Sequence, residues 1–467
     1  MPKRSASSPD RDSTPRSKRI QISSDEANGT GQLQPAISTQ SPQVNHNAVD
    51  VEGNIENYDE DNESELEDHY GSEVLLPDHS AGGDLYLETV DRKRLDFDFE
   101  KLCSVSLSNV NVYACLVCGK YFQGRGKSSH AYFHSVDEDH HVFINLLSLK
   151  VYVLPESYEV KSTALDDIKY VVNPVFTKAQ VAELDKTLVV SYDLFHEPYL
   201  PGFVGINNIK YNDYLNVVVQ ALSHVSPLRN FFMLENFDGR SELAQRFSIL
   251  IRKIWNPKAF KSHVSPHELL QYVSGISKKR FKFTEQSDPF DFINWFLNNL
   301  HVVLGGSKSK PKSSFIQRTF QGKVRVDSQM ITARADAGDR LMFETDTKIQ
   351  QVIMPFMFLS LELPSAPLFQ GDLEKNIIPQ VSLQTLLEKY NGIKGQELAG
   401  HRKRYKIIEA PPFLTFHIKR LIKTNLSEDT NHTIVTFMPN LLDMSPCTSF
   451  FFFFFFFFFG FFFFFFF

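Results

Sequence analysis

Cysteine is scarce in this chain of 467 residues, and tryptophan occurs only twice. The four cysteines are Cys103, Cys115, Cys118 and Cys447. They do not form a series of spaced pairs, so a disulfide framework is excluded and a reducing compartment is favoured. The first 19 residues are polar and lack the apolar stretch of a secretory signal. We therefore expect the close pair of cysteines to bind metal.

The charge is unevenly distributed. The formal net charge is −6, yet residues 1–19 hold six bases and two acids, whereas residues 50–68 hold ten acids and no base. This pattern does not indicate a uniform nucleic-acid-binding surface, but it allows a local basic arm. Lys3-Arg4 and Arg16–Arg19 fit a nuclear-import signal and equally fit a solvated tail.

Both ends of the chain differ in composition from its middle. Residues 1–82 are rich in Ser, Pro, Asp, Glu, Asn and Gln and poor in aromatics, so we expect them to be disordered. Residues 450–467 are seventeen phenylalanines and one glycine. They are long and apolar enough to span a membrane, but they lack the mixed composition and flanks of a real span. We interpret them as a translated thymine-rich stretch, a gene-model artefact, and expect no membrane association.

A metal site is indicated near residue 115. Cys115 and Cys118 form a CxxC pair, and His134 and His140 follow it. Zinc prefers four thiolate or imidazole ligands in a tetrahedron, which these four side chains provide. The alternatives are surface histidines beside an incidental CxxC, or a redox pair, which the absence of a βαβ pattern disfavours. Short extended runs are expected around the site, at 110–114, 141–146 and 150–154.

The remainder of the chain predicts an α+β fold without internal repeats. Thr177 is expected to cap a short helix over Lys178–Asp185. Apolar spacing predicts further helices and strands from about Tyr199 to Cys447. The expected helices are Asp213–His224, Ser241–Trp255, Pro266–Val273 and Pro289–Leu304, and the expected strands are Phe315–Val326, Val352–Leu361 and Pro412–Lys419.

The stretch Cys115–Leu146 resembles the ubiquitin-binding zinc finger of deubiquitinases, and the resemblance implies a finger over residues 85–190. In that finger a second zinc is often bound. An Arg and a Trp capture the C-terminal Gly-Gly of ubiquitin. Arg125 matches this Arg, but Tyr113 stands at the Trp position. Since Ser and Gln are poor zinc ligands, we expect one zinc ion; the second site would fall on Cys103, Ser106, Gln123 and His130.

The stretch Gly205–Leu222 matches, without a gap, the cysteine box of the ubiquitin-specific proteases, whose pattern reads GLxNLGNTCYMNSxLQxL. Asp213 occupies the position of the nucleophilic cysteine, and Asn208 that of the oxyanion-hole residue. A carboxylate cannot perform thiolate chemistry. An aspartate nucleophile would need other partners, and no motif supplies them. The resemblance implies an inactive, papain-like palm and thumb domain over residues 195–449.

Further motifs extend the resemblance. Gln286–Ile293 is similar to a second protease box, with Phe290 in place of its histidine. Phe320–Gly322 and Pro412–Leu421 are similar to two of the family's strands. The box with the catalytic histidine would lie beyond residue 449, so we expect the domain to be truncated at its C-terminal end.

Together these motifs resemble the branch of the family that is associated with the spliceosomal tri-snRNP. The resemblance implies a nuclear, non-enzymatic scaffold that contacts tri-snRNP proteins and supports tri-snRNP assembly and pre-mRNA splicing. One alternative is an inactive relative that binds ubiquitin or a ubiquitin-like protein. Another is an active thiol deubiquitinase, against which Asp213 speaks. RNA contact through the basic loop Lys308–Lys312 is left open, as is a solvated loop.

Overall fold

The computed structural model describes residues 86–307, 309–335, 341–345, 348–364, 378–423, 428–439, 441–448 and 453–454. The expected disordered tail (1–82) lies outside the described residues, as does the phenylalanine tail apart from residues 453–454. Helices and sheets are mixed, which confirms the α+β class. In the described part of the chain, no helix combines the length and apolar character that crossing a bilayer requires.

The first part is a five-stranded antiparallel sheet with the strand order β2-β1-β3-β4-β5. The expected strands near 112, 142 and 151 are present, whereas two of the five strands and helix α1 were not predicted. Both missed strands are only three residues long, too short for a period-two pattern. The bounds are β1 Val112–Cys115, β2 Tyr121–Gln123, α1 His130–Asp137, β3 Val142–Asn145, β4 Val151–Val153 and β5 Tyr158–Val160.

Two short helices connect this sheet to the helical part, α2 (Asp166–Val172) and α3 (Lys178–Glu183). Thr177 caps α3 as expected, because its hydroxyl accepts a bond from the Gln180 N–H while the Gln180 side chain accepts from the Thr177 N–H. Small elements around these helices are η2 Leu87–Thr89, η3 Arg92–Arg94, η4 Thr163–Leu165, β6 Ser191–Tyr192 and β7 Pro198–Tyr199.

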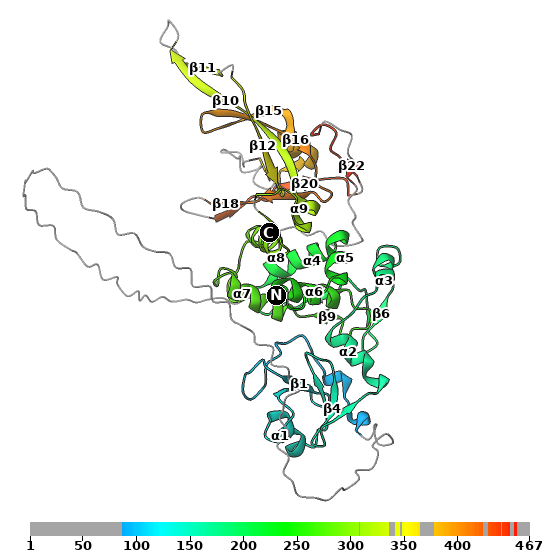
Figure 1. The fold of residues 1–467 in the computed structure, drawn as a ribbon. Coiled ribbons are helices and arrows are strands. Elements are labelled where there is room, and N and C mark those ends of the chain that lie inside the picture. Colours follow the sequence, from blue (N-terminus) through cyan, green and yellow to red (C-terminus); the bar gives the residue numbers. More distant parts are fainter. Residues whose placement is uncertain are drawn as a thin grey trace, which may run out of the picture. The chain divides into compact units, whose positions relative to one another are not determined.

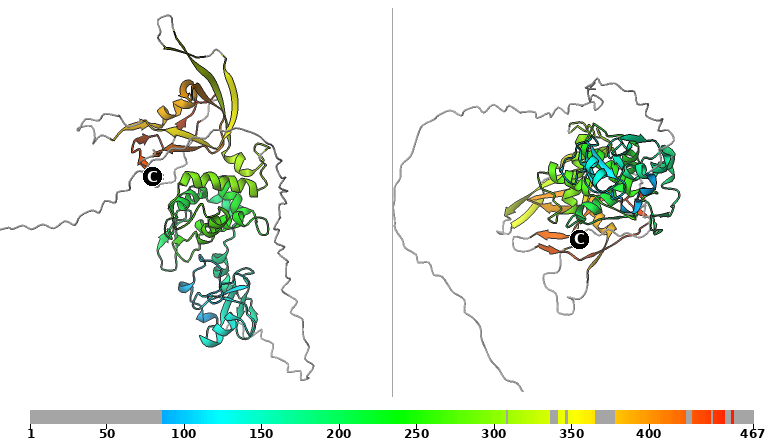
Figure 2. Two further views of the ribbon diagram at one scale, coloured as in Figure 1. Left: turned by 90° about the vertical axis from the view of Figure 1, so that its left-hand side faces the viewer. Right: turned by 90° about the horizontal axis from the view of Figure 1, so that it is seen from below.

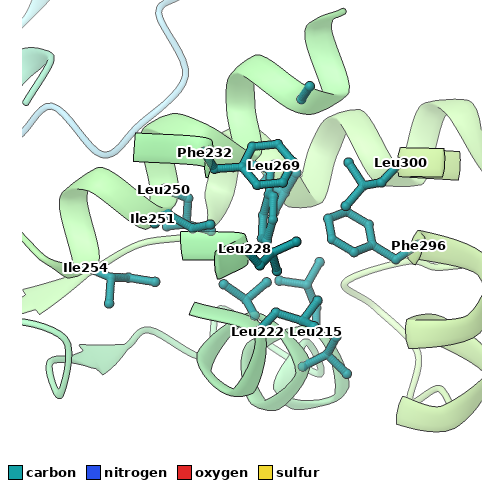
Figure 3. Packing of buried hydrophobic residues seen from close by; sticks show 14 of the residues in the cluster. Leu215, Leu222, Leu228, Phe232, Leu250, Ile251, Ile254, Leu269, Phe296 and Leu300 are labelled. Atoms are coloured by element: carbon teal, nitrogen blue, oxygen red, sulfur yellow. The ribbon is translucent and has the colours of Figure 1, made fainter. Parts of the chain in front are cut away.

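Five helices contribute most of the side chains in the largest hydrophobic core. On α4, buried Leu215, Val218, Val219 and Leu222 recur at helical spacing, so one face of the helix is apolar. Figure 3 shows this face packed against residues of the neighbouring helices, among them Phe296. The bounds are α4 Asp213–Ser223, α5 Ser226–Leu234, α6 Glu242–Ile254, α7 His267–Ile276 and α8 Pro289–Val303, with β8 Gly205–Ile206 and β9 His263–Val264 beside them.

Polar contacts tie the segment before β1 to this helical core. Lys253 of α6 donates from Nζ to the Phe97 carbonyl at 2.7 Å and to the Asp98 carboxylate at 2.9 Å. The other Asp98 oxygen accepts from the Ser265 N–H at 3.0 Å. Buried charges are tolerated only when they are paired and hydrogen-bonded, a condition that this cluster satisfies.

The prediction of a strand over Phe315–Val326 was wrong in its first half. Residues Phe315–Phe320 form helix α9, because Ser314 caps it and the buried Ile316 and Phe320 are spaced four residues apart. The strand β10 begins at Gly322 and continues to Ala335.

β10 is the centre of a second sheet, in which the strands order as β11-β10-β16-β15 and β12 also pairs with β10. Figures 1 and 2 show the long yellow strands of this twisted sheet. One end of the sheet packs on a separate core that includes Val324, Leu361, Leu387 and Ile407. The bounds are β11 Leu341–Thr345, β12 Gln350–Phe356, β15 Asn391–Leu398 and β16 His401–Glu409.

The second of the expected long strands, Val352–Leu361, is divided between β12 and β13 (Phe358–Glu362), and β13 pairs in parallel with β17 (Thr415–Lys419). Helix α10 (Leu383–Leu387) covers this pair of strands through the shared core. Smaller elements are η5 Glu388–Tyr390, β14 Gln380–Ser382, β18 Leu421–Lys423, β19 Glu428–Thr430, β20 Ile434–Thr436, β21 Leu442–Asp443 and β22 Phe453–Phe454.

Candidate metal centre and protease-like motifs

The four predicted ligands come together in the structure. Their donor atoms, one from each of Cys115, Cys118, His134 and His140, all lie within 4.8 Å of one another. The Cys118 sulfur is 3.4 Å from Nε2 of His134, which is 3.1 Å from Nδ1 of His140. Ligand atoms at the corners of a zinc tetrahedron are separated by about 3.3–3.8 Å. The donor set and its spacing therefore fit a zinc ion.

Local geometry explains why the two cysteines face the same point. Cys115 ends β1, and the chain then turns so that the Gly119 N–H donates to the Cys115 carbonyl at 2.9 Å. Gly119 has φ +78°, and a Cβ there would lie 2.5 Å from the Arg94 carbonyl oxygen. Only glycine fits this turn without strain. The turn brings the Cys118 sulfur back toward Cys115.

Helix α1 supplies the third ligand. Its N-cap Ser129 accepts a hydrogen bond from the Tyr132 N–H, which fixes where the helix begins. His134 stacks on Phe122, with ring centroids 4.2 Å apart, and contacts Phe143 edge-on. These aromatic contacts hold the imidazole ring in the orientation that ligation needs.

The two thiols differ in pKa. A hydrogen bond between them lowers the pKa of Cys118 to about 4, and the same bond together with burial raises the pKa of Cys115. Zinc binds the thiolate form of both cysteines, so its binding would release the protons that the pair carries.

The residues at the second zinc position are arranged differently. The Ser106 hydroxyl donates to the Gln123 side-chain oxygen at 2.8 Å, and the Cys103 sulfur accepts from the N–H groups of Val105 and Ser106. Among the described residues, His130 belongs to no cluster of potential ligands. Two of the four residues at this position are thus hydrogen-bonded to each other.

The residues that match the ubiquitin-capturing pair contact one another through a tyrosine. The Arg125 guanidinium lies 4.6 Å from the centre of the Tyr152 ring. Tyr113 is only 4% exposed and meets Tyr152 edge-on at 6.1 Å. The ring at the family's tryptophan position is therefore buried, and the arginine is held by a cation–π contact.

Asp213 is the first residue of α4 and is exposed. Its carboxylate accepts a hydrogen bond of 2.7 Å from the side-chain amide of Gln286. A negative charge at a helix N-terminus is favourable because it faces the positive end of the helix dipole. Asn208, at the oxyanion-hole position, accepts a bond of 3.1 Å from the Asn212 N–H. Both side chains thus have structural partners.

Asn212, which sequence reasoning did not single out, organises the turn before α4. It is fully buried; its Oδ1 accepts from the Ile209 N–H at 2.6 Å, and its Nδ2 donates to the Asn207 carbonyl and to Asn216. Its position directly before the nucleophile slot was the available signal.

Phe290, in place of the second box's histidine, stacks on His417 with ring centroids 3.5 Å apart and planes 8° apart. His417 lies on β17, so this contact joins the helical part to the C-terminal strands. Burial lowers the pKa of His417, which favours the neutral ring that stacks on phenylalanine. The sequence analysis did not single out His417.

Comparisons with known proteins agree with this geometry. The family model described as "Ubiquitin carboxyl-terminal hydrolase" matches residues 204–450. The model described as "Zn-finger in ubiquitin-hydrolases and other protein" matches residues 103–165, and this domain implies zinc binding. The hydrolase match spans the helical part and the sheet around β10. The zinc-finger match contains all four clustered ligands.

Among curated proteins, the "Probable mRNA-splicing protein ubp10" of Schizosaccharomyces pombe is 55% identical over 82% of this chain and 75% of its own length. The human "Ubiquitin carboxyl-terminal hydrolase 39" is 48% identical over 77% of this chain and 66% of its own length, so the chain spans slightly less than two thirds of that relative. A solved structure described as an essential yeast splicing factor matches with a TM-score of 0.62 at 32% identity, over 77% of this chain and 83% of the other. The chain therefore belongs to the ubiquitin carboxyl-terminal hydrolase family, in a branch that includes pre-mRNA-splicing proteins.

Proposed function

We propose that this chain supports pre-mRNA splicing as a non-enzymatic scaffold of the spliceosomal tri-snRNP, acting in the nucleus through contacts with tri-snRNP proteins. The observation that carries the proposal is the 55% identity to an mRNA-splicing protein over 82% of the chain. The fold agreement with an essential yeast splicing factor supports it. The domain bounds 85–190 and 195–449 are part of the same proposal.

The absence of protease chemistry rests on Asp213. Its carboxylate occupies the nucleophile position and is hydrogen-bonded to an amide rather than to a base. Carboxylate oxygen cannot replace the thiolate in acyl transfer that depends on a cysteine–histidine pair. The retained helix, turn and strands then serve as a rigid surface for partners.

The zinc site has a structural role in this proposal. One ion would be held by Cys115, Cys118, His134 and His140, and it would link β1, α1 and the segment before β3. Four protein ligands leave no open position for a reacting water, as in structural zinc sites generally. The Ser106–Gln123 contact supports a count of one ion.

Ubiquitin recognition by the finger is the runner-up function. The burial of Tyr113 and the contact of Arg125 with Tyr152 speak against it, because both side chains are engaged within the finger. A contact with ubiquitin through another surface of the chain would be a weak one.

Affinity purification tests the proposal. The tagged full chain is expressed in S. pombe and purified from nuclear extract. The U4, U5 and U6 RNAs that co-purify are measured against a tag-only control. We expect all three RNAs to be enriched together. A parallel capture on immobilised ubiquitin separates the runner-up: retention on ubiquitin without enrichment of the three RNAs would overturn the scaffold assignment.

A further inference from the structure

Strand β16 carries an unusual concentration of positive charge for a chain whose net charge is −6. Arg402, Arg404 and Lys406 alternate along it, so they lie on the same face of the sheet at intervals of about 7 Å. The opposite face carries Ile407, which belongs to the hydrophobic core beneath the sheet. The three cations therefore lie on the outer face.

Neighbouring strands continue this outer face. The registers pair Lys406 with Arg325 of β10 and pair Arg402 with Gln329 of β10. We call the set Lys323, Arg325, Asp327, Gln329, Asn391, Gly395, Glu397, Arg402, Arg404, Lys406 and Glu409 the basic face. These paired rows of β10, β15 and β16 hold five cations, three acids and no apolar side chain. On the other side of β10, β12 continues the same face with the exposed residues Ile353 and Pro355, opposite Arg325 and Lys323.

Two of the three acids on the basic face are already neutralised. Asp327 forms an ion pair with Arg325, and Glu409 pairs with Lys323 and with Lys312 of the predicted basic loop. Glu397 is the cross-strand partner of Arg402, but the two side chains form no ion pair. Within the described part of the chain, no carboxylate forms an ion pair with Arg402, Arg404 or Lys406.

Neighbouring residues also fix the positions of two of these three cations. Arg404 donates to the Gln329 side-chain oxygen at 2.6 Å. Arg402 lies across β15 at Gly395, where a Cβ would come within 2.7 Å of the arginine Nε. Glycine at this position therefore gives the arginine room to lie along the sheet.

We propose that the basic face binds the phosphate backbone of RNA, an inference that rests on the proposed role in splicing and names a class of partner. Guanidinium groups match phosphate oxygens with two parallel hydrogen bonds, and the spacing of the cations along one strand suits a repeating anion. Protein partners usually bury apolar or aromatic anchors at the centre of an interface. The paired rows of β15 and β16, where Arg402, Arg404 and Lys406 lie, carry no such anchor, and the exposed Ile353 and Pro355 of β12 lie at the far edge of the face. Without aromatic side chains for base stacking, binding is to the backbone and independent of sequence.

The test uses the full chain and a fluorescein-labelled 20-base-pair RNA duplex, with binding followed by anisotropy at several salt concentrations. The variant R402Q/R404Q/K406Q removes the three free cations. The matched control K127Q/K278Q/K279Q removes three exposed cations that no described carboxylate pairs with. Circular dichroism checks that both variants keep the wild-type fold.

We expect R402Q/R404Q/K406Q to bind at least about tenfold more weakly at low salt and to lose about two to three units of the slope of log affinity against log salt. The control should bind the duplex as tightly as the wild type. No duplex binding by the wild type, or equal loss in both variants, would overturn the proposal. Binding of poly-glutamate without binding of RNA would overturn it in favour of an acidic protein. The assay needs no spliceosomal component, so failure here leaves the scaffold assignment to its own co-purification test.

Discussion

The carboxylate of Asp213 and the side-chain amide of Gln286 are joined by a hydrogen bond of 2.7 Å. Gln286 belongs to the second of the two protease-like motifs, so the bond connects the start of α4 with the segment before α8. In the described residues, no histidine side chain is hydrogen-bonded to Asp213. The contact therefore joins two segments that lie far apart in the sequence.

Loss of a zinc ligand should unfold the finger. Structural zinc sites contribute their binding free energy directly to folding, so Cys115→Ala should remove protection from hydrogen exchange across residues 112–160. Cys103→Ser is the matched control, because Cys103 is buried in the same region but lies outside the cluster. Elemental analysis should give one zinc per chain for wild type and control. Two zinc ions, or unchanged protection in Cys115→Ala, would contradict the site.

The sequence indicates this metal site because cysteine and histidine ligands at a characteristic spacing can be recognised without knowledge of the fold. It does not indicate α1, because two turns with four aromatic or histidine residues resemble an extended segment as much as a helix. Helices such as α4 and α6, by contrast, show their apolar face in the spacing of residues alone.

Long-range polar partners cannot be read from the sequence. Lys253 donates to the Asp98 carboxylate, which lies 155 positions earlier in the chain. Nothing in the neighbours of Lys253 in the chain distinguishes it from a surface side chain. The first half of the strand expected from Phe315 is helix α9 instead. There the N-cap Ser314 outweighs the β-like composition of the residues that follow.

Removal of Arg229 should destabilise the helical core strongly. Arg229 is 1% exposed, lies 4.5 Å from the centre of the Trp255 ring and donates two bonds to Asp185 at 2.8 and 2.9 Å. We expect Arg229→Ala to lower the free energy of unfolding by about 3 kcal/mol or more, measured by urea denaturation. Arg280→Ala breaks an exposed ion pair and should cost less than about 1 kcal/mol. Equal effects of the two substitutions would contradict this account.

The same contact predicts a pH dependence. The hydrogen bond from Arg229 holds the pKa of Asp185 below its ordinary value of 3.8. A depressed carboxyl pKa adds stability above that value and loses it as the pH falls through the folded-state pKa. The difference in unfolding free energy between wild type and Asp185→Asn should therefore be constant near neutral pH and shrink below pH 3.8. A difference that grows on acidification would have the wrong sign.

Strand β12 should promote self-association. Val352, Ile353 and Met354 are 54%, 60% and 50% exposed, and β12 pairs with only one strand among the described residues. An exposed apolar edge strand is a template for pairing with other chains. Ile353→Glu places a charge at this edge and should reduce light scattering at high protein concentration. Leu147→Glu changes an apolar residue that is 91% exposed outside any strand and should have less effect. A larger effect of Leu147→Glu than of Ile353→Glu would show that the chains associate through a surface other than β12.

Cleavage of a ubiquitin C-terminal fluorophore reporter tests the central claim, that this family fold operates here without protease chemistry. Wild type and Asp213→Cys are compared with an active protease of the family. We expect no turnover by the wild type. Asp213→Cys should also remain inactive, because a thiol needs an activating base and catalytic residues act as a unit. Turnover by Asp213→Cys would reveal a base near α4, and turnover by the wild type would contradict the account.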